Sequence, residues 1–347
     1  MKTKKVLAAA TAVVLSTGVG YADNYTLQSV FPLNLPSLGP APQNFANLVS
    51  LMTDGDMTIS VHGAGEFVPP FELFGAVSSG ALDMGYDWVG YWAQQIPVAS
   101  IVAAMPFGPS PDVTLAWMFY GGGREIIQKA YDPFNVRYIP CHVPISESGG
   151  WFNKEINTIE DFKGLNMRIA GLGGKVLARA GANTQVVPAG EIYLGLETGR
   201  LDSAEIGTPQ LDAGMGFQKV AKYYYFPGWH QVASWNSIIV NGDVWADMSE
   251  REQEILEQAC MANISFNLAN MVNAQAEAIA EIRAAGVEIR RFPDEVLNEL
   301  RRISEEVLEE EATTDPIFAE ALASIQSYVA TVGEWTELQA LPPREDR

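Results

Sequence analysis

The chain has 347 residues, 48% of them apolar and 18% charged, which is the composition of a folded globular protein and excludes a disordered or collagen-like chain. Its length predicts two domains. Lys and Arg number 22 against 42 Asp and Glu, a net charge of −20, so the protein lacks the basic surface that nucleic acids and anionic membranes require.

The first residues have the pattern of a secretory signal peptide. Three lysines precede the apolar run 6–19, which is shorter than the ~20 residues that a membrane-spanning helix needs. Ala22 closes a cleavage site of small residues, so Asp23 is the expected mature start. We therefore predict a signal peptide over 1–22 and a periplasmic protein. The alternative is an ordinary buried N-terminal helix.

Strand and helix patterns alternate along the mature chain, which predicts an α/β fold with parallel strand pairing. The alternation restarts after Gly149, as expected for two similarly wound lobes. The expected strands are 25–30, 57–61, 82–86, 150–152, 167–169, 185–187, 201–205 and 287–289. The expected helices are 42–52, 71–77, 176–179, 189–198, 294–310 and 316–332.

The longest predicted element is a single helix that begins after Ser249. Ser249 and Glu252 form a capping box, and no Pro or Gly follows until Gly286. At 1.5 Å per residue this helix runs ~50 Å, long enough to brace two lobes. We assign 23–145 plus 234–273 to lobe I and 146–233 plus 274–347 to lobe II, with the helix over about 250–285 shared between them.

The chain has two cysteines, Cys141 in an apolar run and Cys260 in the long helix. Export permits a disulfide, but the sequence does not give the distance between the two residues. Buried cysteines behave as small hydrophobic residues, so two free thiols are the favoured interpretation. A single bridge stays open as the alternative.

Several motifs together resemble the solute-binding proteins of TRAP (tripartite ATP-independent periplasmic) transporters, in the branch that binds 2-oxo acids and related small carboxylates. They occur in the family's order over most of the mature chain: EFVPPFE at 66–72, YGGG at 120–123, GGWFNKEI at 149–156, KGLNMRIAG at 163–171, PAGEIY at 188–193, AE at 204–205 and KYYYFPGW at 222–229. The resemblance implies a two-lobed periplasmic binding protein-like fold (type II), each lobe a sheet flanked by helices, that closes on a ligand.

Arg168 is the candidate anchor for the ligand. It lies between apolar neighbours, where a buried guanidinium needs a partner, and guanidinium groups match carboxylates with two parallel hydrogen bonds. A surface arginine paired with Glu160 or Asp161 is the alternative. The resemblance implies that the arginine of this motif binds the ligand carboxylate.

The resemblance also implies a cation beside the ligand. Glu205 ends a predicted strand, at the sheet edge where α/β folds bind ligands. Carried over by motif, the metal ligands are Glu205, the carbonyl of Ile206, Glu147 and Gln231. The family has Gln at the position of Glu147 and Glu at that of Gln231, so the two side chains are exchanged here. The set keeps two carboxylates and suits Na⁺ or Ca²⁺.

Aromatic residues provide the candidate walls of the ligand pocket. Trp88 and Tyr91 follow a predicted strand in the first lobe, and Phe107 is a weaker candidate. Core packing is the alternative for all three. The three histidines, His62, His142 and His230, show no metal or catalytic spacing, so we expect structural or surface roles for them.

The sequence therefore predicts a periplasmic protein, not an enzyme, that captures a small monocarboxylate (a 2-oxo or 2-hydroxy acid) with a cation and delivers it to TRAP membrane permease subunits. A homodimer is possible. Two alternatives remain open: an exported ligand sensor, and an exported hydrolase or lyase that uses Glu147 and Glu205 as an acid–base pair. No nucleotide-binding fingerprint and no Gly-x-Ser-x-Gly motif supports the enzyme.

Overall fold

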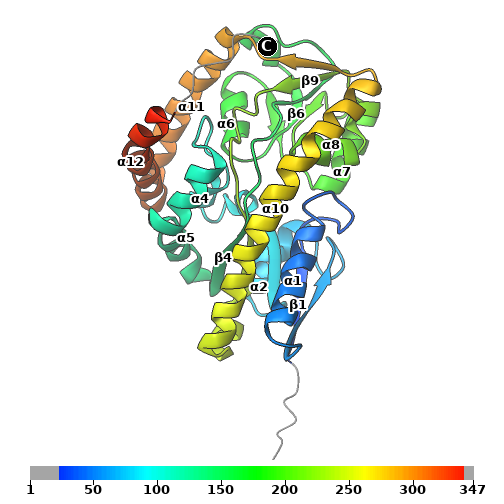
Figure 1. The fold of residues 1–347 in the computed structure, drawn as a ribbon. Coiled ribbons are helices and arrows are strands. Elements are labelled where there is room, and N and C mark those ends of the chain that lie inside the picture. The colour runs from blue at the N-terminus through cyan, green and yellow to red at the C-terminus, as the bar shows by residue number, and fades with distance from the viewer. Residues whose placement is uncertain (1–22, 340–347) are drawn as a thin grey trace, which may run out of the picture.

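The computed structural model of the protein describes residues 23–339 (Figure 1). The signal peptide predicted over 1–22 and the end of the polar tail, 340–347, lie outside the described residues. Within 23–339, no helix is long and apolar enough to cross a membrane.

The first sheet has five strands in the order β2-β1-β3-β10-β4. β1 pairs in parallel with β2 and β3, as predicted, but β10 runs antiparallel to both β3 and β4. The prediction of parallel pairing did not include this antiparallel strand, because β10 returns to the sheet from the second half of the chain. The strands are β1 Asp23–Ser29, β2 Met57–His62, β3 Met84–Trp88, β4 Val136–His142 and β10 Asn236–Asn241.

The second sheet has six strands in the order β11-β9-β5-β8-β6-β7. β6 pairs in parallel with β7 and β8, and β11 with β9, whereas β5 is antiparallel to both of its neighbours. These strands are short: β5 Gly150–Phe152, β6 Asn166–Arg168, β7 Asn183–Gln185, β8 Ser203–Ala204, β9 Tyr223–Phe226 and β11 Glu288–Arg291. The two sheets define a two-lobed α/β fold, as predicted, although the lobe boundaries stay a prediction.

Helices flank both sheets (Figure 1). α11 packs on α6 of the second lobe, and α12 packs on α3, α4 and α5 of the first lobe, so this helix pair joins the two lobes on one side. The helices are α1 Pro40–Met52, α2 Leu73–Ser78, α3 Val98–Ala103, α4 Pro111–Tyr120, α5 Gly123–Tyr131, α6 Gly171–Arg179, α7 Ala189–Glu197, α8 Pro209–Gly214, α9 Gly242–Asp247, α10 Glu250–Ala284, α11 Asp294–Thr314 and α12 Pro316–Leu338.

The predicted long helix is α10, which has 35 residues. Its capping box is formed as expected, because the Ser249 backbone donates to Glu252 Oε2 and the Glu252 backbone donates to Ser249 Oγ. α10 contacts α1 and β4 in the first lobe and α8 in the second. Figure 1 shows it running along the molecule past both lobes, which confirms its predicted place as a brace.

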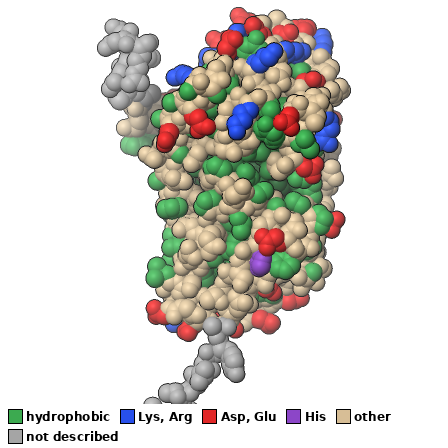
Figure 2. Space-filling view, turned by 90° about the vertical axis from the view of Figure 1, so that its right-hand side faces the viewer, with side chains coloured by type: hydrophobic (Ala, Val, Ile, Leu, Met, Phe, Trp, Pro, Cys, Tyr) green, Lys and Arg blue, Asp and Glu red, His purple; other side chains and the backbone are tan. Residues whose placement is uncertain are grey.

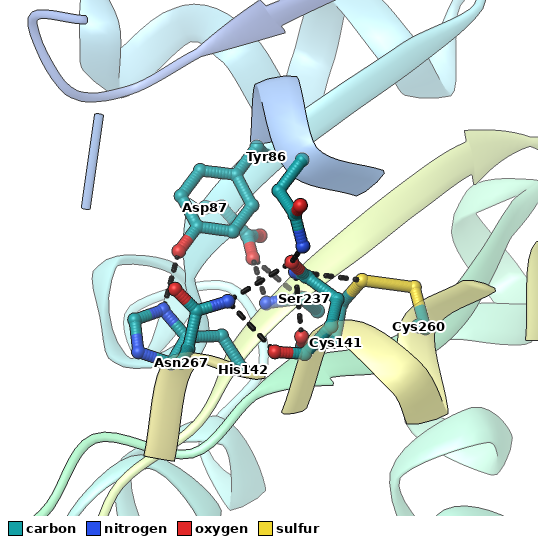
Figure 3. Close-up of a disulfide and its surroundings, with 9 residues drawn as sticks. Tyr86, Asp87, Cys141, His142, Ser237, Cys260 and Asn267 are labelled. Carbon is teal, nitrogen blue, oxygen red and sulfur yellow. Dashed lines mark hydrogen bonds between the residues drawn. A yellow bond between two sulfur atoms is a disulfide. The ribbon is translucent and has the colours of Figure 1, made fainter. Parts of the chain in front are cut away.

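A disulfide joins α10 to the first sheet (Figure 3). Cys141 of β4 and Cys260 of α10 are bridged, so the preference for two free thiols is wrong. The reason is the packing of α10 on β4, which brings the two Cα atoms to 4.3 Å. Asn263 of α10 adds a hydrogen bond to the carbonyl of Cys141 at 3.0 Å.

Candidate functional site

The candidate site lies between the two lobes, where several strands end. Trp88 ends β3, Arg168 ends β6, and Glu205 directly follows β8. The carboxyl ends of parallel strands are where α/β folds bind ligands. One pocket is lined by residues of both lobes: Phe31, Ser37, Leu38, Trp88, Tyr91, Pro144, Glu147, Arg168, Ala170, Glu205, Ile206, Gly207, Thr208, Leu211, Gln231, Asn236 and Met271.

Arg168 and Glu205 form a buried ion pair in this pocket. Arg168 is 2% exposed, and its Nη1 donates to the carbonyl of Glu205 and, at 3.1 Å, to Glu205 Oε1. The Ala170 amide donates to the same carboxylate oxygen at 2.9 Å. Despite its burial, the pKa of Glu205 is lowered, because the positive charge of Arg168 lies beside it. Arg168 Nε has no protein partner among the described residues, so at least one buried guanidinium N–H remains for a ligand.

Glu147 and Gln231, the exchanged pair, are direct neighbours. Gln231 Nε2 donates to Glu147 Oε1, and the Glu147 amide donates to the carbonyl of Gln231 at 3.2 Å. Glu147 Oε2 is buried without a hydrogen-bond partner in the described part of the chain. Burial raises the pKa of Glu147, because the desolvation of its carboxylate outweighs the opposing effect of the nearby His230.

His230 completes this cluster. It is 3% exposed at its side chain, and its Nε2 lies 3.3 Å from Glu205 Oε2 and 3.5 Å from Glu147 Oε2. Burial opposes protonation, but the two carboxylates outweigh it and raise the pKa of His230 to about 9. The sequence did not predict a site position for His230. The sequence feature that could have indicated a site position is that His230 lies between Trp229 and Gln231, because the spacing between the histidines carries no such information.

A third buried carboxylate, Asp212, supports the segment that carries Glu147. Asp212 Oδ2 accepts hydrogen bonds from Tyr224 Oη at 2.7 Å, Trp151 Nε1 at 2.8 Å and Ser148 Oγ at 3.3 Å. Burial raises the pKa of Asp212 to about 7. Because Ser148 is the next residue after Glu147, this network fixes the backbone from which Glu147 reaches the pocket.

The cluster fits a metal ion. One ligand atom from each of Glu147, Glu205 and His230 lies within 4.8 Å of the other two, and Glu147 Oε2 has no protein partner in the described residues. Because the raised pKa of His230 favours a protonated ring without a free lone pair, the two carboxylates are the donors that suit an ion. Carboxylate, amide and carbonyl oxygens are the ligands that Ca²⁺ and Na⁺ accept. The predicted metal ligands Ile206 and Gln231 line the same pocket.

Of the predicted wall residues, two lie at the pocket and one does not. Trp88 and Tyr91 line it, with their ring centroids 5.1 Å apart. Phe107 does not line it. The Phe107 ring packs on Trp229 and under the guanidinium of Arg301, at 4.2 Å from the ring centroid. The pocket also contains Ser37, Thr208 and Asn236, which the sequence did not single out because isolated neutral polar residues carry no recognisable spacing.

This fold and site are those of an extracytoplasmic binding protein, and the sequence comparison agrees. The chain belongs to the DctP family of bacterial extracellular solute-binding proteins (family 7), whose model matches residues 29–315. The predicted family resemblance is therefore confirmed.

Individual relatives cover nearly the whole chain. The monocarboxylate 2-oxoacid-binding periplasmic protein of Nostoc sp. is 34% identical over 86% of this chain and 82% of its own. A TRAP periplasmic solute-binding protein from Colwellia psychrerythraea, solved with calcium and pyruvate, is 34% identical with a TM-score of 0.88, covering 91% of this chain and 97% of that one. The corresponding protein from Pseudoalteromonas atlantica, solved with sodium and pyruvate, is 33% identical with the same TM-score and coverage.

Proposed function

We propose that this protein is the periplasmic solute-binding subunit of a TRAP transporter, and that it captures a small 2-oxo monocarboxylate together with Ca²⁺ or Na⁺. The observation that carries the proposal is the cluster of Arg168, Glu205 and Glu147 in one buried interlobe pocket. Its relatives, which bind such acids or were solved with pyruvate and a cation, support the same ligand class.

Arg168 is the proposed anchor of the ligand carboxylate. Its charge is permanent, and Nε is a buried donor without a protein partner among residues 23–339. Its bond to the Glu205 carbonyl holds the guanidinium in place before a ligand arrives. Such preorganisation lowers the entropy cost of binding.

Glu147, Glu205, Gln231 and the Ile206 carbonyl are the proposed cation ligands. A bound cation would supply positive charge for the ligand's oxygens and offset the two buried carboxylates. With Ca²⁺, Arg168 and the ion together supply three positive charges against two carboxylates and the anionic ligand, whereas Na⁺ would leave one negative charge for other groups to offset. Trp88 and Tyr91 are proposed to cover the ligand from the first lobe.

The test is a thermal-shift screen of small carboxylates, run with and without a chelator and in sodium-free buffer. Pyruvate and its close homologues should raise the melting temperature, because a ligand that binds only the native state stabilises it. Dicarboxylates and neutral analogues should have little effect. No shift with any 2-oxo acid under any cation condition would contradict the proposal.

The proposal includes that the protein binds its ligand without converting it. An enzyme that used Glu147 and Glu205 as acid and base would convert the acid, so incubation with pyruvate followed by product analysis should return it unchanged. A sensor subunit would bind the same ligand but signal to a membrane kinase. Delivery to TRAP permease subunits is favoured by membership of the family. Dimerisation stays a prediction.

A further inference from the structure

Asn236 is a buried polar residue that the proposed site does not use. It is the first residue of β10 and is 1% exposed, yet neither its Oδ1 nor its Nδ2 has a hydrogen-bond partner within the described chain. Leaving a buried amide unpaired is unfavourable. The β10–β4 register shifts between Asn236 and Ser237, and such bulges re-aim side chains beside binding sites.

Two further neutral groups in the same pocket are also unpaired. Ser37 Oγ and Thr208 Oγ1 are buried without partners among residues 23–339, and both residues line the pocket with Asn236. Trp88 Nε1, in contrast, already donates to Ser234 Oγ at 2.7 Å. The pocket thus contains a set of free neutral hydrogen-bonding groups, separate from the charged cluster.

Pyruvate does not have enough polar atoms to form hydrogen bonds with the unpaired side chains of Asn236, Ser37 and Thr208. Its carboxylate and keto oxygens are all assigned to Arg168 and the cation, which leaves a methyl group for the rest of the pocket. Arg168 and Glu205 belong to the second lobe, whereas Asn236 and Ser37 belong to the first. A ligand anchored at Arg168 therefore presents its far end to the first lobe.

We propose that Asn236 is a specificity residue that hydrogen-bonds a polar substituent on carbon 3 of the ligand, so that the preferred ligands are 2-oxo acids with a hydroxyl or carbonyl group at that carbon. This inference rests on the proposed function and narrows its ligand class. Ser37 and Thr208 are the available second partners of the same substituent.

The test compares hydroxypyruvate with 2-oxobutyrate, which differ only by a hydroxyl in place of a methyl group. Isothermal titration with the cation present should show hydroxypyruvate binding about tenfold more tightly to the wild-type protein, the effect of one buried hydrogen bond. Asn236→Leu keeps the size of the side chain and should remove this difference. The control Asn44→Leu makes the same exchange in α1, outside the pocket, and should retain it.

Equal binding of the two acids to the wild-type protein would overturn the inference, whether or not Asn236→Leu folds. A difference that persists in Asn236→Leu would also overturn it, since another residue would then read the hydroxyl. If no 2-oxo acid, pyruvate included, binds the wild-type protein, the proposed function itself fails. Pyruvate binding combined with equal affinity for the two probes would reject only the role of Asn236.

Discussion

The two lobes contribute different chemistry to the same pocket. Residues 23–145, which supply most of the first lobe, have three Lys and Arg against ten Asp and Glu, whereas 146–233 have eight against nine. Figure 2 shows blue basic side chains gathered in the upper part of the molecule, the end that contains β6 and β9 in Figure 1. The segment 146–233 is thus nearly neutral. The rest of the second lobe, 274–347, has seven Lys and Arg against 17 Asp and Glu, so both lobes carry a net negative charge.

The two lobes differ at the pocket itself. Arg168 and Glu205 come from the second lobe, whereas the first lobe provides aromatic rings and neutral polar groups such as Trp88, Tyr91 and Asn236. Charge recognition is therefore concentrated on the second-lobe side of the pocket. We expect the second lobe to capture the anion first, with the first lobe then adding contact area and selectivity.

The long helix is also attached differently to the two lobes. The Cys141–Cys260 disulfide joins it covalently to the first sheet. On the second-lobe side, the described contacts include hydrogen bonds such as Gln210 N to Gln275 Oε1 at 3.0 Å. We therefore expect α10 to stay fixed to the first lobe when the two lobes move relative to each other.

The strongest test of this comparison is Arg168→Ala, which removes the proposed anchor from the second lobe. Loss of a buried charge-assisted pair should weaken pyruvate binding by about 2–5 kcal/mol. Arg179→Ala, at a half-exposed ion pair on α6, is the control and should bind as the wild type does. Titration calorimetry is the measurement. Binding by Arg168→Ala within a few-fold of wild type would mean that the anchor lies elsewhere.

Removing the disulfide should affect stability but not binding. In the variant with Cys141→Ala and Cys260→Ala, the free energy of unfolding should fall by about 2–4 kcal/mol, because the unfolded chain regains the freedom of a loop of 119 residues. Urea unfolding measures this. Pyruvate affinity should stay unchanged, since neither cysteine lines the pocket. An unchanged free energy of unfolding, or a large loss of pyruvate affinity, would show that the disulfide does not attach α10 to the first lobe in the way described.

Changes at the exchanged pair, Glu147 and Gln231, should have an intermediate effect on ligand affinity. Glu147→Gln alone leaves one protein carboxylate near the cation and should weaken ligand and cation binding together. Adding Gln231→Glu restores two carboxylates and should recover most of the affinity, with a coupling of roughly 0.5–3 kcal/mol between the two changes. Glu155→Gln, at an exposed glutamate, is the control. Strictly additive losses would mean that Glu147 and Gln231 do not share an ion.

The smallest effects are expected on the first-lobe side. Tyr91→Ala removes a ring that lines the pocket and should weaken pyruvate binding by several-fold. Phe107→Ala makes a similar truncation outside the pocket and should change affinity by less than about twofold, as expected for a residue without ligand contact. The same calorimetric titration measures both variants. Equal losses of pyruvate affinity in the two variants would show that Phe107 contributes to ligand binding as much as Tyr91 does.

The sequence predicted the elements that depend on local patterns. The Ser249 capping box and the absence of Pro and Gly gave α10 almost to the residue. Arg168 was predicted within a strand and Glu205 at the end of another, and the family resemblance placed both at the ligand site. The structure brings their side chains within 3.1 Å of each other. Short-range signals were sufficient because helix caps and strand ends are set by neighbouring residues.

The missed features all depend on contacts between distant parts of the chain. The bridge between Cys141 and Cys260 follows from α10 packing on β4, and the antiparallel β10 follows from a chain crossing that no local pattern encodes. His230 meets Glu147 and Glu205 only because three separate loops converge. Asn236 is distinctive only through its burial and its missing partners.

The central claim is that ligand and cation share one site built on Arg168, Glu205 and Glu147. Its most direct test is to titrate pyruvate with and without Ca²⁺ in sodium-free buffer, and then to titrate Ca²⁺ with and without pyruvate. Pyruvate and Ca²⁺ should each raise the affinity of the other by the same factor, as thermodynamic linkage requires for coupled sites. Pyruvate affinity that is the same with Ca²⁺, with Na⁺ and with neither ion would contradict the central claim.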